Sequence, residues 1–332
     1  MRLCTLSTFF IILVLVFYAY PTNASAGDRD PEFIDCVSQC TDTICALKPR
    51  LPFTLLLTLW TCPQNCQYTC MQTITSAAKL SGQPIVQYFG KWPFYRLWGI
   101  QEPASVLFSL GNLYFHRRYW FLLRRDLPSS YPLRPHYLGW SLASINTWVW
   151  SSVFHTRDFL LTERLDYFSA ALTILYALHF SVLRIFRIPD RSFVARAWMG
   201  LCITCYLAHV AYLSLIHFDY RYNAIAVGSV GVLHNVLWLG WSAWQYSGKA
   251  RAAGANRSYA WYPTAAGVLI SAAMGLEIFD FPPFLGVLDA HSLWHLATVP
   301  LIPLWYRFMI KDARFEGGRG VVERWNDGKR RV

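Results

Sequence analysis

Apolar residues along this chain gather in long runs that short polar and basic stretches separate. From about residue 97 onward, seven runs approach the roughly 20 residues that a helix needs to cross the hydrocarbon core of a membrane. They are 97–116, 137–156, 165–183, 197–217, 224–244, 261–279 and 288–310. The pattern therefore predicts an all-α membrane protein, with a bundle of seven transmembrane helices over residues 97–310.

The first 26 residues have the pattern of a cleavable signal peptide. Arg2 is followed by an apolar run from Phe9 to Tyr20 and by small residues at 24–26, which is the order that such peptides share. An uncleaved membrane anchor is the alternative interpretation of the same run. Cleavage would begin the mature chain near Gly27, in the lumen of the secretory pathway.

A more polar stretch over residues 27–96 carries six of the nine cysteines. They are Cys36, Cys40, Cys45, Cys62, Cys66 and Cys70. An even number of cysteines in an oxidising compartment predicts three disulfides that staple a small luminal domain, with their pairing left open. Zinc knuckles are the rival interpretation, but the spacing lacks paired CxxC elements. The apolar run Leu51–Trp60 is too short to span a bilayer, so we expect it in the core of this domain or against the membrane.

Composition and charge agree with a membrane protein. The chain is 55% apolar and only 15% charged, which is not typical of a soluble globule. Its net charge of +11 is spread over alternate loops, which favours a topology signal over nucleic-acid binding. Because cytosolic loops collect Lys and Arg, we expect a luminal N-terminus and a basic cytosolic tail over residues 311–332. Together with the signal peptide, this orientation is that of a multi-pass protein of the secretory pathway, which we expect in the membrane of the endoplasmic reticulum or Golgi.

A few polar residues interrupt the apolar runs at the membrane depth nearest the lumen. They are Ser151, His155, Asp166, His291 and His295. Ionisable groups within membrane spans are costly and usually functional. The pairs at 151 and 155 and at 291 and 295 are four residues apart, so each pair projects from one helix face. Three imidazoles, a carboxylate and a hydroxyl are the groups of a hydrolytic zinc centre with one position open for water.

From these groups we predict a zinc-dependent hydrolase in which His155, His291 and His295 hold Zn²⁺. Metal binding can lower the pKa of a water to about 7 and polarise an ester carbonyl. Asp166 would take the proton of that water or orient it, and Ser151 would donate a hydrogen bond to the water or to the developing oxyanion. A route with Ser151 as nucleophile is the alternative, but a zinc-bound histidine is a poor base, which favours water.

The spacing of these five positions resembles that of the seven-span membrane hydrolases that include alkaline ceramidases and adiponectin-type receptors. Within this superfamily, the chain most resembles the family of phospholipases A2 that remodel glycosylphosphatidylinositol (GPI) lipids. The segments that carry the resemblance are the six-cysteine stretch, 88–94, 101–105, 151–158 and 289–295. The resemblance implies removal of the sn-2 acyl chain from GPI-anchored proteins, which would be the partners. Of two serines in the family motif, spacing favours Ser151 over Ser152.

Other functions stay open on the residues alone. Another membrane lipid amidase or esterase, such as a ceramidase, would use the same groups. A metal transporter or a seven-span receptor would use intramembrane histidines and acids to bind ions, although transport predicts polar residues through the whole membrane depth. Glu102, near the luminal end of the first run, could hold a structural Ca²⁺ or pair with another helix, and pairing is the favoured interpretation.

Overall fold

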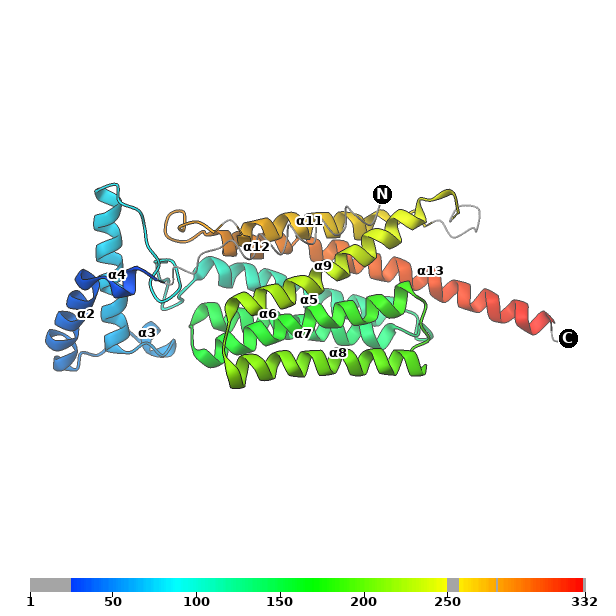
Figure 1. The fold of residues 1–332 in the computed structure, drawn as a ribbon, viewed down its shortest axis with the longest axis horizontal. Coiled ribbons are helices and arrows are strands. Elements are labelled where there is room, and N and C mark those ends of the chain that lie inside the picture. Colours follow the sequence, from blue (N-terminus) through cyan, green and yellow to red (C-terminus); the bar gives the residue numbers. More distant parts are fainter. Residues whose placement is uncertain (1–24, 250–256, 279, 331–332) are drawn as a thin grey trace. The chain divides into compact units, whose positions relative to one another are not determined.

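The computed structural model of the chain consists of helices joined by turns and loops, of which the connection from α4 to α5, residues 81–102, is long (Figure 1). It describes residues 25–249, 257–278 and 280–330, with side chains up to residue 318. Within these ranges the strand-like contacts are isolated bridges, such as the one between Tyr88 and Lys91. The predicted all-α class is therefore confirmed. The predicted signal peptide, residues 1–26, lies outside the described residues except for its last two.

Three helices of the described part are long and apolar enough to cross a membrane. They are α7 (Leu160–Ile185), α8 (Phe193–Ala211) together with the π-helical turn η3 (Tyr212–Ile216), and α9 (Tyr220–Gln245). They coincide with the third, fourth and fifth predicted runs. The sequence of α8 leaves many apolar side chains exposed, including Leu201, Ile203 and Leu207, as expected of a surface that faces lipid.

The other predicted runs are also helical. They form α5 (Pro103–Asp126), α6 (Arg134–Thr156), α11 (Trp261–Ile278), and the pair α12 (Ala290–Thr298) and α13 (Leu301–Arg330). That they cross the membrane as well stays a prediction. One expectation was wrong, because the run 288–310 is two helices with a turn at residues 299–300. Pro300 lies in this turn and has no backbone N–H for a continuous helix. Beyond residue 310, α13 continues through most of the predicted tail.

The chain forms two compact units. The first contains residues up to Phe108 with 152–162 and 276–294, and the second contains 109–151, 163–275 and 295–332. Helices α5, α6 and α12 each contribute residues to both units. The predicted site is divided accordingly, with His155 and His291 in the first unit and its three other members in the second.

The cysteine-rich helices belong to the first unit. A 3₁₀ turn η1 (Gly27–Arg29) leads into α2 (Pro31–Thr43), and η2 (Cys45–Leu47) and α3 (Phe53–Leu57) precede α4 (Cys62–Leu80). The three disulfides are Cys36–Cys70, Cys40–Cys66 and Cys45–Cys62. Cys36 and Cys40 on α2 and Cys66 and Cys70 on α4 are four residues apart and pair across the two helices, and Cys45 of η2 joins the first residue of α4. The prediction of three disulfides is confirmed, and with all six sulfurs bonded the zinc-knuckle interpretation fails.

The apolar run before α4 divides between the core and the surface of the first unit. Leu55 and Trp60 are buried, whereas Phe53 and Leu57 are exposed. The Trp60 indole donates a hydrogen bond to the carbonyl of Gly99 over 2.8 Å. The run therefore fixes the turn that leads into α5 and also presents apolar side chains outward.

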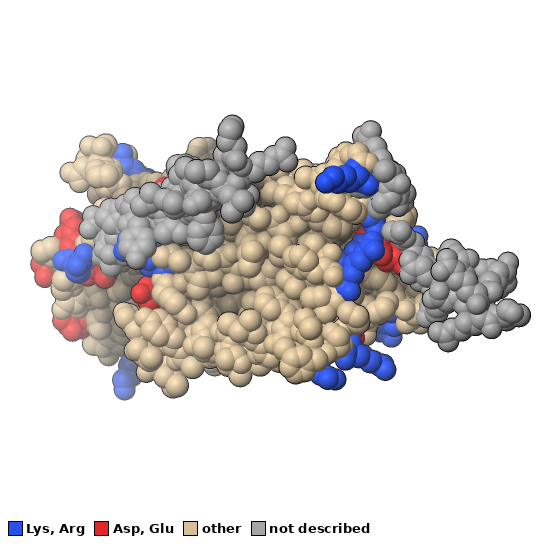
Figure 2. Space-filling model, turned by 45° about the vertical axis from the view of Figure 1, so that its right-hand side comes forward, with Lys and Arg blue, Asp and Glu red and all other residues tan. Residues whose placement is uncertain are grey.

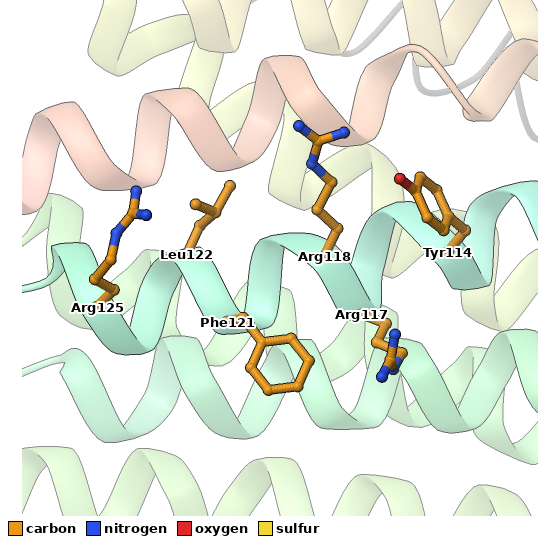
Figure 3. Close-up of a pocket in the computed structure, with 6 residues that line it drawn as sticks. All are labelled: Tyr114, Arg117, Arg118, Phe121, Leu122 and Arg125. Carbon is orange, nitrogen blue, oxygen red and sulfur yellow. The ribbon is translucent and has the colours of Figure 1, made fainter.

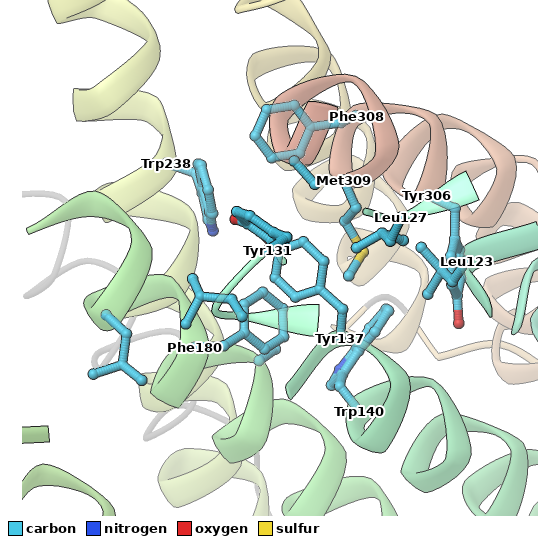
Figure 4. Close-up of a cluster of buried hydrophobic side chains, with 14 of the residues drawn as sticks. Leu123, Leu127, Tyr131, Tyr137, Trp140, Phe180, Trp238, Tyr306, Phe308 and Met309 are labelled. Atoms are coloured by element: carbon cyan, nitrogen blue, oxygen red, sulfur yellow. The ribbon is translucent and has the colours of Figure 1, made fainter. Parts of the chain in front are cut away.

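Buried aromatic side chains hold the second unit together (Figure 4). Tyr137, Phe180, Trp238 and Phe308 come from α6, α7, α9 and α13 and are almost completely buried. Beside this core, Arg184 of α7 forms a two-fold ion pair with Asp312 of α13, with N–O distances of 2.6 and 2.7 Å. Close aromatic packing and a buried ion pair thus fix neighbouring helices of this unit.

Candidate metal centre

Two histidines of the first unit face each other. His155 lies in the last turn of α6 and His291 in the first turn of α12, and their Nε2 atoms are 3.4 Å apart. Two nitrogen ligands on a tetrahedral zinc ion, each bonded at about 2.0–2.1 Å, lie roughly 3.3–3.4 Å from each other. The pair therefore has the separation that one shared ion requires.

A carboxylate holds each of these two histidines through its other ring nitrogen. His155 Nδ1 lies 2.7 Å from Glu102 Oε2, and His291 Nδ1 lies 2.7 Å from Glu277 Oε2. Such a contact keeps the proton on Nδ1, so that Nε2 presents its lone pair, and it is the usual outer partner of a metal-binding histidine. The Glu102 side chain is 6% exposed and the Glu277 side chain is 39% exposed.

Lys91 extends this arrangement on the side of Glu102. Its Nζ lies 2.5 Å from Glu102 Oε1 and 3.1 Å from Asp158 Oδ2, and it sits 4.1 Å from the centre of the Phe154 ring. Burial alone would lower the pKa of Lys91, but the two carboxylates raise it. Lys91 therefore stays protonated and stabilises the negative charge that Glu102 needs to hold His155. The pairing expected for Glu102 is thus observed.

A serine takes the corresponding place for the third histidine, in the second unit. Ser109 Oγ lies 2.9 Å from His295 Nδ1 and 3.0 Å from Ser151 Oγ. The Asn112 side chain donates a hydrogen bond to the His295 carbonyl over 2.9 Å. Ser109, Ser151 and His295 are all buried. The predicted residues Ser151 and His295 are therefore brought together through Ser109.

Predicted site residues on the same helix are one turn apart on both α6 and α12. His295 follows His291 by one turn on α12, and Ser151 precedes His155 by one turn on α6. Asp166 lies in the second turn of α7, with a half-buried side chain. Its participation with the histidines stays a prediction.

Three supporting residues escaped the sequence-based prediction: Lys91, Ser109 and Glu277. Glu277 carried one usable signal, because the predicted topology puts it at the luminal end of its run, whereas Ser109 lies past the middle of the run 97–116. Lys91 lies outside the apolar runs and gave no such signal. None of the three forms a local pair with its histidine, so spacing along one helix could not identify them.

The fold and these residues define a helical membrane protein with a histidine site of metal-binding type. Comparison with known proteins is more specific. The model of the Per1-like family matches residues 52–313. The chain is 36% identical to a "Protein PER1 homolog" of Schizosaccharomyces pombe over 332 residues, covering 97% of this chain and 98% of the relative. This chain belongs to the Per1-like family.

Vertebrate relatives match over a similar length. The chain is 36% identical to a "GPI-specific phospholipase A2-like PGAP3" of Xenopus laevis over 308 residues, which cover 91% of this chain and 94% of the relative. The protein of the same name from Homo sapiens is 34% identical over 317 residues, with coverage of 92% and 94%. The resemblance drawn from the sequence motifs is confirmed.

Proposed function

We propose that this chain is a zinc-dependent acyl hydrolase of the secretory pathway that removes the sn-2 acyl chain of GPI-anchored proteins. The observation that carries the proposal is the 3.4 Å separation of the His155 and His291 Nε2 atoms, each behind a carboxylate at Nδ1. The names of the vertebrate relatives support a GPI lipid as the substrate and a phospholipase-type reaction.

The residues fit a zinc ion by their chemistry. Imidazole nitrogens are among its usual ligands, and a hydrolytic site needs three of them with a fourth position open. His155, His291 and His295 would be these ligands, because each has a hydrogen-bonding partner at Nδ1 that orients the ring. When bound, zinc would supply an acidified water and polarise the ester carbonyl.

The remaining residues would move protons and stabilise charge. Ser151 would donate its hydroxyl hydrogen to the oxyanion that develops on the ester oxygen, while Ser109, 3.0 Å away, fixes its direction. Asp166 would accept a proton from the attacking water and return it to the leaving alkoxide. The products are a free fatty acid and a lyso-GPI lipid.

The proposed topology puts this chemistry on the luminal side, where GPI-linked proteins reside. The N-terminus would be luminal and the C-terminus cytosolic, in the endoplasmic reticulum or Golgi membrane. The disulfides of the first unit support this side for the N-terminal part, because disulfides persist in the oxidising lumen.

The test is hydrolysis by the purified full chain in detergent, with free fatty acid and lyso-product measured from a GPI lipid with defined chains. His155→Ala and His291→Ala should abolish release and lose zinc in parallel. His217→Ala is the matched control, because His217 lies exposed in the loop before α9. Full activity of zinc-free protein, or an acyl group trapped on Ser151, would overturn the zinc-water mechanism.

The choice of substrate needs its own comparison in the same assay. Ceramide, as an amide with similar chains, tests the amidase alternative, and ion flux in proteoliposomes tests the transporter. Release of fatty acid from ceramide but not from the GPI lipid, or flux without a lyso-product, would contradict the proposed activity.

A further inference from the structure

Arginines gather around an open hollow on α5, a few turns beyond Ser109. The hollow has a volume of about 450 Å³ and lies in the second unit (Figure 3). It is lined by Tyr114, Arg117, Arg118, Phe121, Leu122 and Arg125. We call it the α5 arginine hollow. None of its residues takes part in the candidate metal centre.

The side chains that the structure describes neutralise the positive charge of this hollow only in part. Arg117 and Arg118 are exposed, and among the described side chains neither forms an ion pair with an acid. Arg125 pairs with Asp126 over 2.7 Å, and Asp126 also lies 3.4 Å from Arg314. Two guanidinium groups are thus left to a ligand, and guanidinium binds phosphate oxygens through paired hydrogen bonds.

The same helix carries exposed apolar side chains next to these arginines. Leu110, Tyr114 and Phe121 are 48%, 55% and 50% exposed. With Arg118 they follow one another at intervals of three or four residues, so they share one helix face. Leu110 and Arg118 are eight residues apart, which is roughly 12 Å along the helix. One face therefore offers an apolar strip that ends at unpaired positive charge.

This combination matches the two parts of a phospholipid. Figure 2 shows a broad surface without Lys, Arg, Asp or Glu, with charged side chains on either side of it and mostly Lys and Arg on one of these sides. At such an edge, apolar strips meet acyl chains and basic residues meet headgroups. A soluble phosphate would use the arginines but would gain nothing from Leu110 and Tyr114.

We propose that the α5 arginine hollow binds one anionic phospholipid. Arg117 and Arg118 hold its phosphate, and its acyl chains lie along the strip from Tyr114 to Leu110. Phe121 supports the headgroup end, since the Arg117 guanidinium lies 5.4 Å from its ring centre and this contact limits the directions that the guanidinium can take. The site is independent of the proposed hydrolase activity.

The experiment measures lipid binding by the full chain in phosphatidylcholine nanodiscs. A fluorescent phosphatidylinositol 4-phosphate is titrated against the wild type and Arg117→Gln/Arg118→Gln. A charge-assisted hydrogen bond contributes roughly tenfold to binding, so the double variant, which loses two guanidinium donors, should bind the lipid on the order of 100-fold more weakly. The matched control is Arg124→Gln/Arg196→Gln, which removes the same charge at exposed positions outside the hollow and should stay within about two-fold of the wild type, because exposed charges that do not contact the ligand are screened by salt.

Two further comparisons test whether the ligand is a lipid or a soluble phosphate, and whether binding depends on the hollow or on net charge. Tyr114→Ser should weaken binding of the lipid but leave binding of its water-soluble, deacylated headgroup unchanged. Equal affinity of the wild type for the lipid and the headgroup would overturn a phospholipid as the ligand. Equal losses in the two double-arginine variants would overturn the site, because charge alone would then explain binding.

Discussion

The carboxylate behind each histidine provides the sharpest test of the metal centre. Glu102→Gln keeps an oxygen that can accept the His155 Nδ1–H but removes the negative charge between His155 and Lys91, which lie 2.7 and 2.5 Å from Glu102. Glu277→Gln makes the same change behind His291. The two substitutions are chemically identical, but Glu102 is more buried than Glu277 and also pairs with Lys91.

Their expected effects follow from that difference. Loss of an outer partner of a metal ligand typically weakens metal binding 10- to 100-fold, which corresponds to about 1.4–2.8 kcal/mol. Glu102 is 6% exposed and Glu277 is 39% exposed, and water screens the more exposed charge. We therefore expect the Kd for zinc to rise about 100-fold in Glu102→Gln and about 10-fold in Glu277→Gln.

Zinc affinity can be measured by competition with a chelator of known affinity, with bound zinc counted by mass spectrometry. Glu32→Gln is the matched control, because Glu32 is exposed in the first turn of α2 and should not change the affinity. Wild-type affinity in both test variants would refute the role of these carboxylates. The reverse order, with the larger loss in Glu277→Gln, would refute the reasoning from burial.

Three other outcomes are expected. Ser151→Ala should lower kcat about 100- to 1000-fold with zinc retained, as for loss of one oxyanion donor. Ser152→Ala should lower kcat less than about tenfold. Equal losses of fatty acid release in the two variants would contradict the assignment of Ser151. Asp312→Asn should lower the free energy of unfolding by about 1.5–3 kcal/mol, since it removes one of the two acids that pair with the buried Arg184 and leaves Glu316, as measured by denaturant unfolding in detergent. Removing metal with 1,10-phenanthroline should abolish hydrolysis and added zinc should restore it, and activity that survives chelation would count against the metal.

Hydropathy and cysteine number predicted the parts of the fold that depend on local sequence. Three apolar runs are membrane-capable helices, and the six cysteines of residues 27–96 form three disulfides. Their pairing could not be predicted, because six cysteines allow 15 connectivities and the choice depends on the relative direction of α2 and α4. The break between α12 and α13 did have a local signal in Pro300, which the surrounding apolar residues concealed.

The candidate site shows a similar division between local and distant information. Pairs four residues apart, such as His291 and His295, are visible in the sequence because the helix repeat brings them to one face. The partners behind the histidines are distant, with Glu102 53 residues from His155 and Ser109 186 residues from His295. Predicted topology gives the depth of a residue in the membrane but not the side of the helix on which it lies. The sequence could therefore predict the proposed metal-binding histidines but not the residues that hydrogen-bond to them.

The stretch between α4 and α5, residues 81–102, makes contacts near both carboxylates that hold the histidines of the first unit. Lys91 contacts Glu102 behind His155, while the indole of the next residue, Trp92, donates a hydrogen bond to Asp280 over 2.8 Å. Asp280 follows Glu277, which holds His291, by three residues. Two disulfides join α2 to α4 and a third joins η2 to α4, and Gln72 of α4 donates hydrogen bonds to the carbonyls of Pro93 and Phe94 over 3.3 and 2.8 Å. We therefore expect the disulfides to contribute to the geometry of the two histidines, although no cysteine lies among the proposed ligands.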